Sequence, residues 1–151
     1  MVLAVQRESF KSTLQHGAVP MWYAIRRHVV DSLDTRVALV HHKEQMASKN
    51  IQRIERKALA DPWFRRVWPE FCPAEGVKDF GTKFEFDWAN RELTSASEPS
   101  VEAFGMTSTK TGSHYDLMVF SDATTDEHRK SRLVRQDAVD RFEALITMRD
   151  T

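Results

Sequence analysis

Short apolar runs alternate with helix-forming segments in the first part of the chain, and this alternation constrains the fold more than any other feature. Residues 2–5 and 36–41 are almost wholly apolar, as are strands covered on both faces of a parallel sheet. Each run is followed by a segment that predicts a helix, over residues 12–33 and 43–60. Strand, helix, strand and helix in this order predict right-handed βαβ units and an α/β fold.

The helix predicted over residues 43–60 carries the clearest periodicity in the chain. Its apolar side chains recur at spacings typical of one buried face, namely Ala47, Ile51, Ile54 and Ala58. Its basic side chains lie mostly on the other faces, namely Lys49, Arg53, Arg56 and Lys57. The earlier helix contains Gly17 and Pro20, which we expect to kink or split it.

Length and composition set broad limits. A chain of 151 residues fits a single domain. The 22 basic and 22 acidic residues cancel, so any contact with DNA would have to come from a local patch. Cys72 has no partner for an intrachain disulfide, and no apolar run approaches the roughly 20 residues of a membrane span. We therefore expect a soluble intracellular protein.

The segment after the first apolar run has the order of parts found in a phosphate-binding loop. It reads Gln6, Arg7, Glu8, Ser9, Phe10, Lys11, Ser12 and Thr13. In such loops backbone N–H groups at a helix N-terminus face the phosphate, the lysine reaches the β- and γ-phosphates, and a hydroxyl binds Mg²⁺. Val5 and Phe10 stand where the common pattern has glycines, so a strand followed by an ordinary N-capped helix remains an alternative.

The middle of the chain gives weaker signals. Asp61 and Pro62 predict the N-cap and first residue of a short helix. That helix carries an aromatic and apolar stripe that favours a core position over base stacking, made up of Trp63, Phe64, Val67 and Trp68. Residues 83–88 alternate between polar and apolar, which predicts a strand with one solvent-exposed face, and residues 101–104 alternate again. Residues 107–114 predict an exposed loop.

A second informative stretch lies near the end of the chain. Residues 115–120 predict a buried strand that ends at Ser121 and Asp122, with Asp126 and Glu127 just beyond. Open α/β sheets bind ligands at the carboxyl ends of their strands, and phosphate-loop ATPases hold Mg²⁺ with an acid at this position. The alternative is an aspartate that caps the next turn. An amphipathic helix is predicted over residues 127–148, with Val134, Ala138, Phe142 and Leu145 on one side.

Taken together, these stretches resemble the ATPase domain of a tailed-phage terminase large subunit, the motor that packages viral DNA. The resemblance runs over residues 2–144 and rests on residues 6–13, 36–40, 61–70, 98–105 and 111–122 in that order. It implies a three-layer α/β/α P-loop NTPase-like core with a mainly parallel sheet and a β-rich insertion. It also implies that residues 1–151 form a single but partial ATPase domain that binds ATP and Mg²⁺, with the nuclease domain absent.

The same resemblance assigns roles to individual residues. Arg7 would contact the nucleotide phosphates and stabilise charge at the γ-phosphate, and Lys11 would neutralise the β- and γ-phosphates. Ser12 and Asp122 would bind Mg²⁺, with Thr13 beside them in the first helical turn. Terminases usually end the later strand with two acids, whereas this chain has Ser121 before Asp122. Either Asp126 or Glu127 assists Asp122, or hydrolysis is impaired.

The partners implied by the resemblance are double-stranded viral DNA, a portal protein, a terminase small subunit and further copies in a homo-oligomeric ring, within the host cell cytoplasm. By this resemblance the segment that would hold the adenine base and a later strand would be missing, so we expect either a piece of a longer protein or a truncated reading frame. We also expect marginal stability or dependence on a partner chain. Two other classes stay open, a helicase-like phosphate-loop ATPase and a non-catalytic α/β interaction module. A metal hydrolase is disfavoured because the adjacent His41 and His42 would point to opposite sides of a strand.

Overall fold

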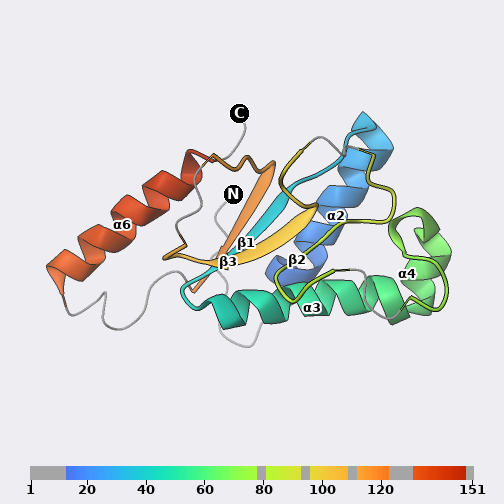
Figure 1. Ribbon diagram of the computed structural model, residues 1–151, viewed down its shortest axis with the longest axis horizontal. Coiled ribbons are helices and arrows are strands. Elements are labelled where there is room, and N and C mark those ends of the chain that lie inside the picture. The colour runs from blue at the N-terminus through green and yellow to red at the C-terminus, as the bar shows by residue number, and fades with distance from the viewer. Residues whose placement is uncertain (1–12, 78–80, 93–95, 109–111, 123–130, 149–151) are drawn as a thin grey trace.

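A mostly parallel sheet with helices on both faces forms the centre of the molecule (Figure 1). The computed structural model describes residues 13–77, 81–92, 96–108, 112–122 and 131–148. Within these residues the sheet has four strands in the order β2-β3-β1-β4. The α/β fold with a mainly parallel sheet is therefore confirmed. No helix in the described part of the chain has the length and apolar character to cross a membrane.

The central strand is β1 (Val37–His41), which is buried along its whole length. It pairs in parallel with β3 (Val101–Gly105) on one side and with β4 (Leu117–Ser121) on the other. The short strand β2 (Glu85–Phe86) pairs antiparallel with β3 at the far edge. The apolar run at residues 36–41 thus forms the strand that the sequence predicts, with both faces covered.

The first helical segment is continuous from Leu14 to Asp31. It consists of η1 (Leu14–Ala18), α2 (Val19–Arg26) and η2 (Arg27–Asp31), of which η1 and η2 are wide π turns. Pro20 lacks a backbone N–H, and the wide turn just before it accommodates the missing hydrogen bond without breaking the helix. The segment ends at Ser32, whose left-handed φ of 53° turns the chain out of the helix. The predicted helix is confirmed from Thr13 onward, with wide turns in place of a split.

The helix α3 (Glu44–Ala60) packs the predicted apolar face on the sheet. Ala47, Ile51, Ile54 and Ala58 are all fully buried, in one cluster with residues of β1 and β3. The short helix α4 (Pro62–Val67) follows, and Asp61 caps it as predicted. Oδ1 of Asp61 accepts hydrogen bonds from the N–H groups of Trp63 and Phe64, both at 3.0 Å. A 3₁₀ turn, η3 (Pro69–Phe71), comes next.

Only part of the aromatic stripe on α4 belongs to the core. Phe64 and Trp68 are partly buried and pack against the main apolar cluster. Trp63 is 74% exposed and Val67 is 54% exposed. The prediction that the stripe is core is wrong for these two residues, because so short a helix covers the core with one side only.

The strand β3 is more buried than its alternating sequence predicts. Residues 101–104 alternate in polarity, yet all of β3 is buried. The polar position, Glu102, is only 4% exposed and accepts a hydrogen bond from the hydroxyl of the fully buried Tyr115 at 2.5 Å. Burial raises the pKa of the Tyr115 phenol. The predicted wet face is therefore wrong for β3, whereas in the shorter β2 Glu85 is exposed and Phe86 is buried.

The helix α6 (Arg132–Ile146) covers the other face of the sheet. Leu145 packs in a second apolar cluster with Ala38, Val40, Phe104 and Tyr115, whereas α2 and α3 pack against the first cluster. Helices, sheet and helix thus form three layers, although much of α6 extends beyond the sheet (Figure 1). Of the predicted apolar side of α6, Ala138 and Leu145 are buried, while Val134 and Phe142 are more than a third exposed.

The strand β4 is less buried than the sequence predicts. It is the outermost described strand on its side of the sheet, and only Val119 of its five residues is buried. Phe120 is half-buried, and its ring meets that of Phe142 edge-on, with the centroids 4.7 Å apart. Just before the strand, the Asp116 carboxylate accepts a hydrogen bond from the backbone N–H of Arg36 at 2.8 Å and so ties the starts of β1 and β4 together.

Candidate functional site

Most of the predicted phosphate loop lies outside the described residues. Those positions are Gln6, Arg7, Glu8, Ser9, Phe10, Lys11 and Ser12, and the preceding apolar run also lies outside. Asp126 and Glu127, the two acids considered as helpers of Asp122, lie outside as well. Of the predicted site residues, the structure describes Thr13 and Asp122, and these two locate the predicted site in the fold.

The carboxyl edge between β1 and β4 has the topology of a ligand-binding crevice. After His41 the chain turns into α3 on one face of the sheet, whereas after β4 it continues to α6 on the other face. Open α/β sheets bind ligands where neighbouring strands send their connections to opposite faces, since a crevice opens between them. Asp122 directly follows β4 and therefore stands at this point.

The first helix begins at the same edge of the sheet. The side-chain amide Nε2 of Gln15 donates a hydrogen bond to the backbone carbonyl of Phe120 at 2.7 Å. This contact joins the first turn of η1 to the end of β4. The end of the predicted phosphate loop, at Thr13, and the acid at Asp122 therefore belong to one edge of the sheet.

Asp122 presents an accessible carboxylate from a fixed backbone. Its φ of 41° lies in the left-handed region, which aspartate tolerates better than most residues do. Its backbone carbonyl accepts a hydrogen bond from Nδ1 of His42 at 2.7 Å. Its carboxylate oxygen lies 3.6 Å from Nε2 of His41, yet the side chain remains 75% exposed. The carboxylate thus has the His41 ring on one side and is otherwise largely open to solvent and to a ligand.

His41 is a buried ring with a defined proton position. Its Nδ1 accepts a hydrogen bond from the backbone N–H of Lys43 at 3.0 Å, so the neutral ring carries its proton on Nε2, the atom that faces Asp122. Burial lowers the pKa of His41, the nearby His42 lowers it further, and Asp122 acts in the opposite direction. A neutral His41 therefore directs an N–H group at the Asp122 carboxylate.

The prediction that His41 and His42 point to opposite sides is wrong. The strand β1 ends at His41, so the alternation of a strand does not extend to His42. The centroids of the two rings are 4.4 Å apart, and both residues contact Asp122. Sequence reasoning missed this arrangement because it depends on where the strand ends. The signal that could have indicated it is the pair of histidines directly before a helix start.

Ser121 occupies the position where the resemblance expects the first of two acids. It is the last residue of β4 and pairs in register with His41, so the two side chains share the α3 face of the sheet. Among the described residues, this edge of the sheet carries three side chains with oxygen atoms that could bind a metal ion or a phosphate. They are the Asp122 carboxylate and the hydroxyls of Ser121 and Thr13. Oxygen donors of this kind suit Mg²⁺, which takes one or two carboxylates and completes its shell with phosphate and water. Of the two predicted magnesium ligands, Ser12 and Asp122, the structure describes Asp122, and its exposed carboxylate is a ligand of the kind that this ion prefers.

Cys72 is buried, its thiol lies 3.4 Å from the carbonyl of Trp68, and burial raises its pKa, which suits a structural thiol better than a nucleophile.

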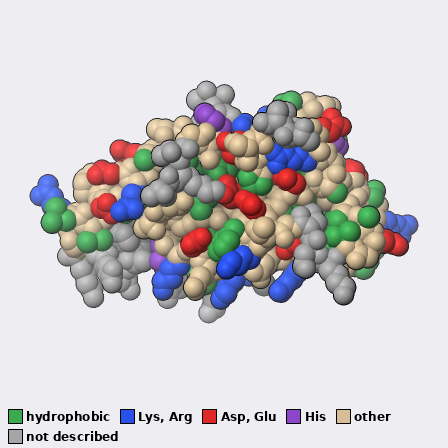
Figure 2. Space-filling view, viewed as in Figure 1, with side chains coloured by type: hydrophobic (Ala, Val, Ile, Leu, Met, Phe, Trp, Pro, Cys, Tyr) green, Lys and Arg blue, Asp and Glu red, His purple; other side chains and the backbone are tan. Residues whose placement is uncertain are grey.

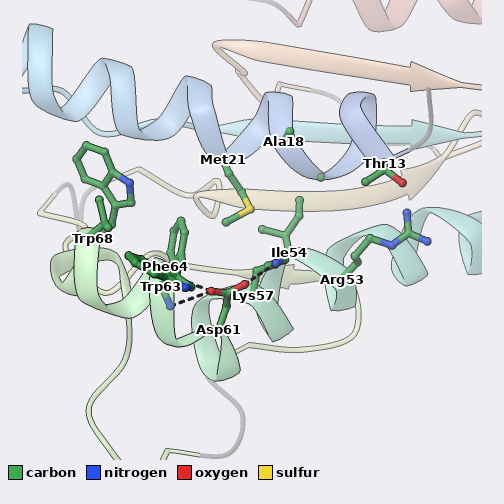
Figure 3. Close-up of a pocket in the computed structure, with 12 residues that line it drawn as sticks. Thr13, Ala18, Met21, Arg53, Ile54, Lys57, Asp61, Trp63, Phe64 and Trp68 are labelled. Carbon is green, nitrogen blue, oxygen red and sulfur yellow. Dashed lines mark hydrogen bonds and ion pairs between the residues drawn. The ribbon is translucent and has the colours of Figure 1, made fainter. Parts of the chain in front are cut away.

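A cavity of about 460 Å³ opens between α2, α3 and α4 (Figure 3). Met21 reaches into it from α2, the rings of α4 line its far side, and Thr13 stands at one end.

Comparison with known proteins gives no relative from which a function could be inferred. No protein-family model matches the chain, and no curated protein matches it.

Proposed function

We propose that this chain is the ATP-binding and ATP-hydrolysing motor domain, in part, of a viral terminase large subunit that drives the packaging of phage DNA. The observation that carries the proposal is the hydrogen bond from Gln15 to the carbonyl of Phe120 at 2.7 Å. It brings the start of the first helix to the strand end that bears Asp122. A phosphate loop before that helix would then face the acid across the switch point of the sheet.

Each residue of the proposed site has a stated task. Lys11 neutralises the β- and γ-phosphates, Arg7 contacts the phosphates, and backbone N–H groups of residues 6–13 surround them. Ser12 and Asp122 hold the magnesium ion, and Thr13 stands in the first turn. When bound, Mg²⁺ supplies charge neutralisation and alignment of the phosphate oxygens. His41 acts as a positioning residue, because its Nε2 proton orients the Asp122 carboxylate.

Binding is supported more strongly than turnover. Asp122 is the one acid at the described end of β4. Ser121 cannot polarise an attacking water as a second carboxylate would, so one of the two roles that terminases give to carboxylates has no residue here. We therefore propose that this chain binds Mg-ATP and hydrolyses it slowly. The proposed partners are double-stranded viral DNA, the portal protein, the terminase small subunit and further copies in a ring, in the host cell cytoplasm.

Calorimetry with Mg-ATP tests the binding proposal. The wild-type chain is expected to bind, the Lys11→Ala variant to lose the binding heat, and Lys83→Ala to bind as the wild type does. Lys83 is a suitable control because it is exposed and lies next to β2, at the opposite edge of the sheet from β4. A folded wild-type chain without binding at millimolar nucleotide, or equal binding by Lys11→Ala, would refute the proposal.

A phosphate-release assay tests the proposal that the chain hydrolyses ATP slowly. Asp122→Ala is expected to abolish any hydrolysis, and Ser121→Asp to raise it, because the new carboxylate would stand beside His41 in register. Loss of binding in Ser121→Asp would contradict this assignment of the position.

A second candidate is a non-catalytic α/β interaction module. The observation that favours it is the contact of Asp122 with both His41 and His42, which gives the acid a structural task without any nucleotide. Under this alternative Asp122→Ala lowers the melting temperature equally with and without Mg-ATP, whereas the motor proposal expects Mg-ATP to stabilise the wild type and not the variant.

A further inference from the structure

The outer face of α3 carries a continuous stripe of positive charge. Lys49, Arg53, Arg56 and Lys57 recur at the spacing of one helical face, turned away from the buried Ile51 and Ile54, and all four are exposed. They line an open cavity of about 760 Å³ that runs along the helix. In the space-filling view, Lys and Arg side chains follow the lower edge of the molecule, where Figure 1 has α3 (Figure 2).

The charge on this stripe is largely uncompensated. Lys57 pairs with Asp61 at 2.5 Å, and Asp61 is the one acid that lines the cavity. Glu55 is buried and lines neither this cavity nor the one beside it. Lys49, Arg53 and Arg56 form no ion pair with any residue that the structure describes. A chain with zero formal net charge thus gathers local positive charge on one surface.

An aromatic surface adjoins the stripe. The cavity between α2, α3 and α4 shares Arg53, Lys57 and Asp61 with the basic one and continues to α4 (Figure 3). Trp63 lines it and is 74% exposed, and the guanidinium of Arg66 lies 6.0 Å from the centroid of its ring. An exposed indole beside a row of cations is the combination that single-stranded nucleic acids bind, with phosphates on the cations and a base on the ring.

We propose that the α3–α4 surface binds a single-stranded nucleic acid. From Lys49 to Lys57 the helix rises about 12 Å, and a stacked strand carries one phosphate per roughly 3.4 Å, so about three or four phosphates would lie along the stripe and its three unpaired cations. An extended acidic peptide presents side chains to one side every ~6.8 Å and would offer only about two carboxylates over the same length. The charge density therefore matches a phosphodiester strand. This inference goes beyond the proposed ATPase and does not depend on it.

Fluorescence anisotropy with a labelled oligothymidylate of about 12 nucleotides tests this surface, within the usual site sizes of roughly 4–16 nucleotides. With one phosphate contact for each of the three unpaired cations, the logarithm of the binding constant is expected to fall with the logarithm of salt at a slope of about −2.1. The double variant Lys49→Gln, Arg56→Gln should reduce the magnitude of this slope to about −0.7. Trp63→Ala should weaken binding about 5- to 150-fold, because stacking of one base is lost.

Matched controls come from the same chain. Trp22→Ala removes another exposed indole, 60% exposed on α2, that lines neither cavity, and Lys83→Gln removes a lysine beside β2. Both should bind the strand as the wild type does, and circular dichroism of every variant checks that it is folded. The Lys49→Gln, Arg56→Gln variant should bind Mg-ATP normally, whereas Lys11→Ala should bind the strand normally. The two proposals therefore fail independently.

Several outcomes would overturn this inference. They are no binding by the folded wild type, an unchanged salt slope in the double variant, and equal binding by Trp63→Ala. Equal affinity for a duplex of the same length would refute base stacking, and equal affinity for polyglutamate would refute the match to phosphates. Parallel titrations with oligodeoxyuridylate and oligouridylate, which differ only in the 2′-hydroxyl, decide which of the two sugars is preferred, and tighter binding of either one supports the proposal.

Discussion

Replacing Tyr115 by phenylalanine removes one oxygen atom from the interior of the protein and should cost measurable stability. The Tyr115 hydroxyl donates to Oε2 of Glu102 at 2.5 Å, and the two residues are 0% and 4% exposed. Removing a donor from a buried acceptor costs about 1–3 kcal/mol, because water cannot replace the lost hydrogen bond. In a domain of this size about 2–4 °C is lost per kcal/mol, so the melting temperature should fall by about 2–12 °C.

Urea denaturation followed by circular dichroism at neutral pH measures this change in the free energy of unfolding. The matched control is Tyr23→Phe, since the chain has only two tyrosines. The Tyr23 hydroxyl lies 3.4 Å from the carbonyl of Asp116 and is only partly buried, so its loss should change stability by less than about 0.5 kcal/mol. A Tyr115→Phe variant as stable as Tyr23→Phe would refute the assignment of a stabilising buried pair.

The same pair predicts a dependence on alkaline pH. Burial raises the pKa of Tyr115 in the folded state above its ordinary value of 10.0. Above that pH the unfolded chain loses the proton first, so the wild type is progressively destabilised as the pH rises. Tyr115→Phe lacks this contribution, and the stability difference between the two proteins should narrow above pH 10 while remaining constant below it. A constant difference across this range would contradict the reasoning.

Three further variants test other elements. Ile54→Ala removes a fully buried side chain of α3 and should cost about 2–5 kcal/mol in urea denaturation, whereas a cost below about 1 kcal/mol would mean that the helix is not packed on the sheet. His41→Asn keeps an acceptor for the Lys43 N–H but cannot be protonated. Because the folded pKa of His41 is lowered, the wild type should lose more stability than the variant as the pH falls through 6.5. Asp61→Ala should lower the melting temperature more than Asp61→Asn, since asparagine still caps α4 at the N–H of Trp63 and Phe64. Equal melting temperatures would show that the cap contributes nothing.

The parts of the fold that depend on local order could be predicted from the sequence. The spacing of Ala47, Ile51, Ile54 and Ala58 identifies the buried face of α3 without any tertiary information. Asp61 followed by Pro62 identifies the start of α4, because capping involves only neighbouring backbone groups. The apolar run of β1 likewise indicates a strand covered on both faces.

The parts that depend on distant partners could not be predicted. Glu102 looks like the wet face of a strand until Tyr115, from another segment, supplies its hydrogen bond. Trp63 looks like core until the shortness of α4 leaves its ring in solvent. At the candidate site, the position of Asp122 follows from an acid after an apolar strand. Its contacts with His41, and the contact between Gln15 and Phe120, need the three-dimensional sheet.

The position of β1 in the sheet also governs how the chain can fold as it is made. The segment that begins β4 follows the start of β1 by 80 residues, the separation between Arg36 and its partner Asp116. At about 5–20 residues per second a ribosome needs about 4–16 s to cover that distance. For most of this interval neither edge of this almost wholly apolar strand has its native neighbour, and after β3 is made the β4 edge still lacks one. Such an edge readily pairs with other chains.

We therefore expect nascent chains that stop before residue 117 to aggregate or to bind chaperones, and chains that include β4 to be released from them. Of the four described strands, β1 is the first to be synthesised and the last to have both of its edges covered.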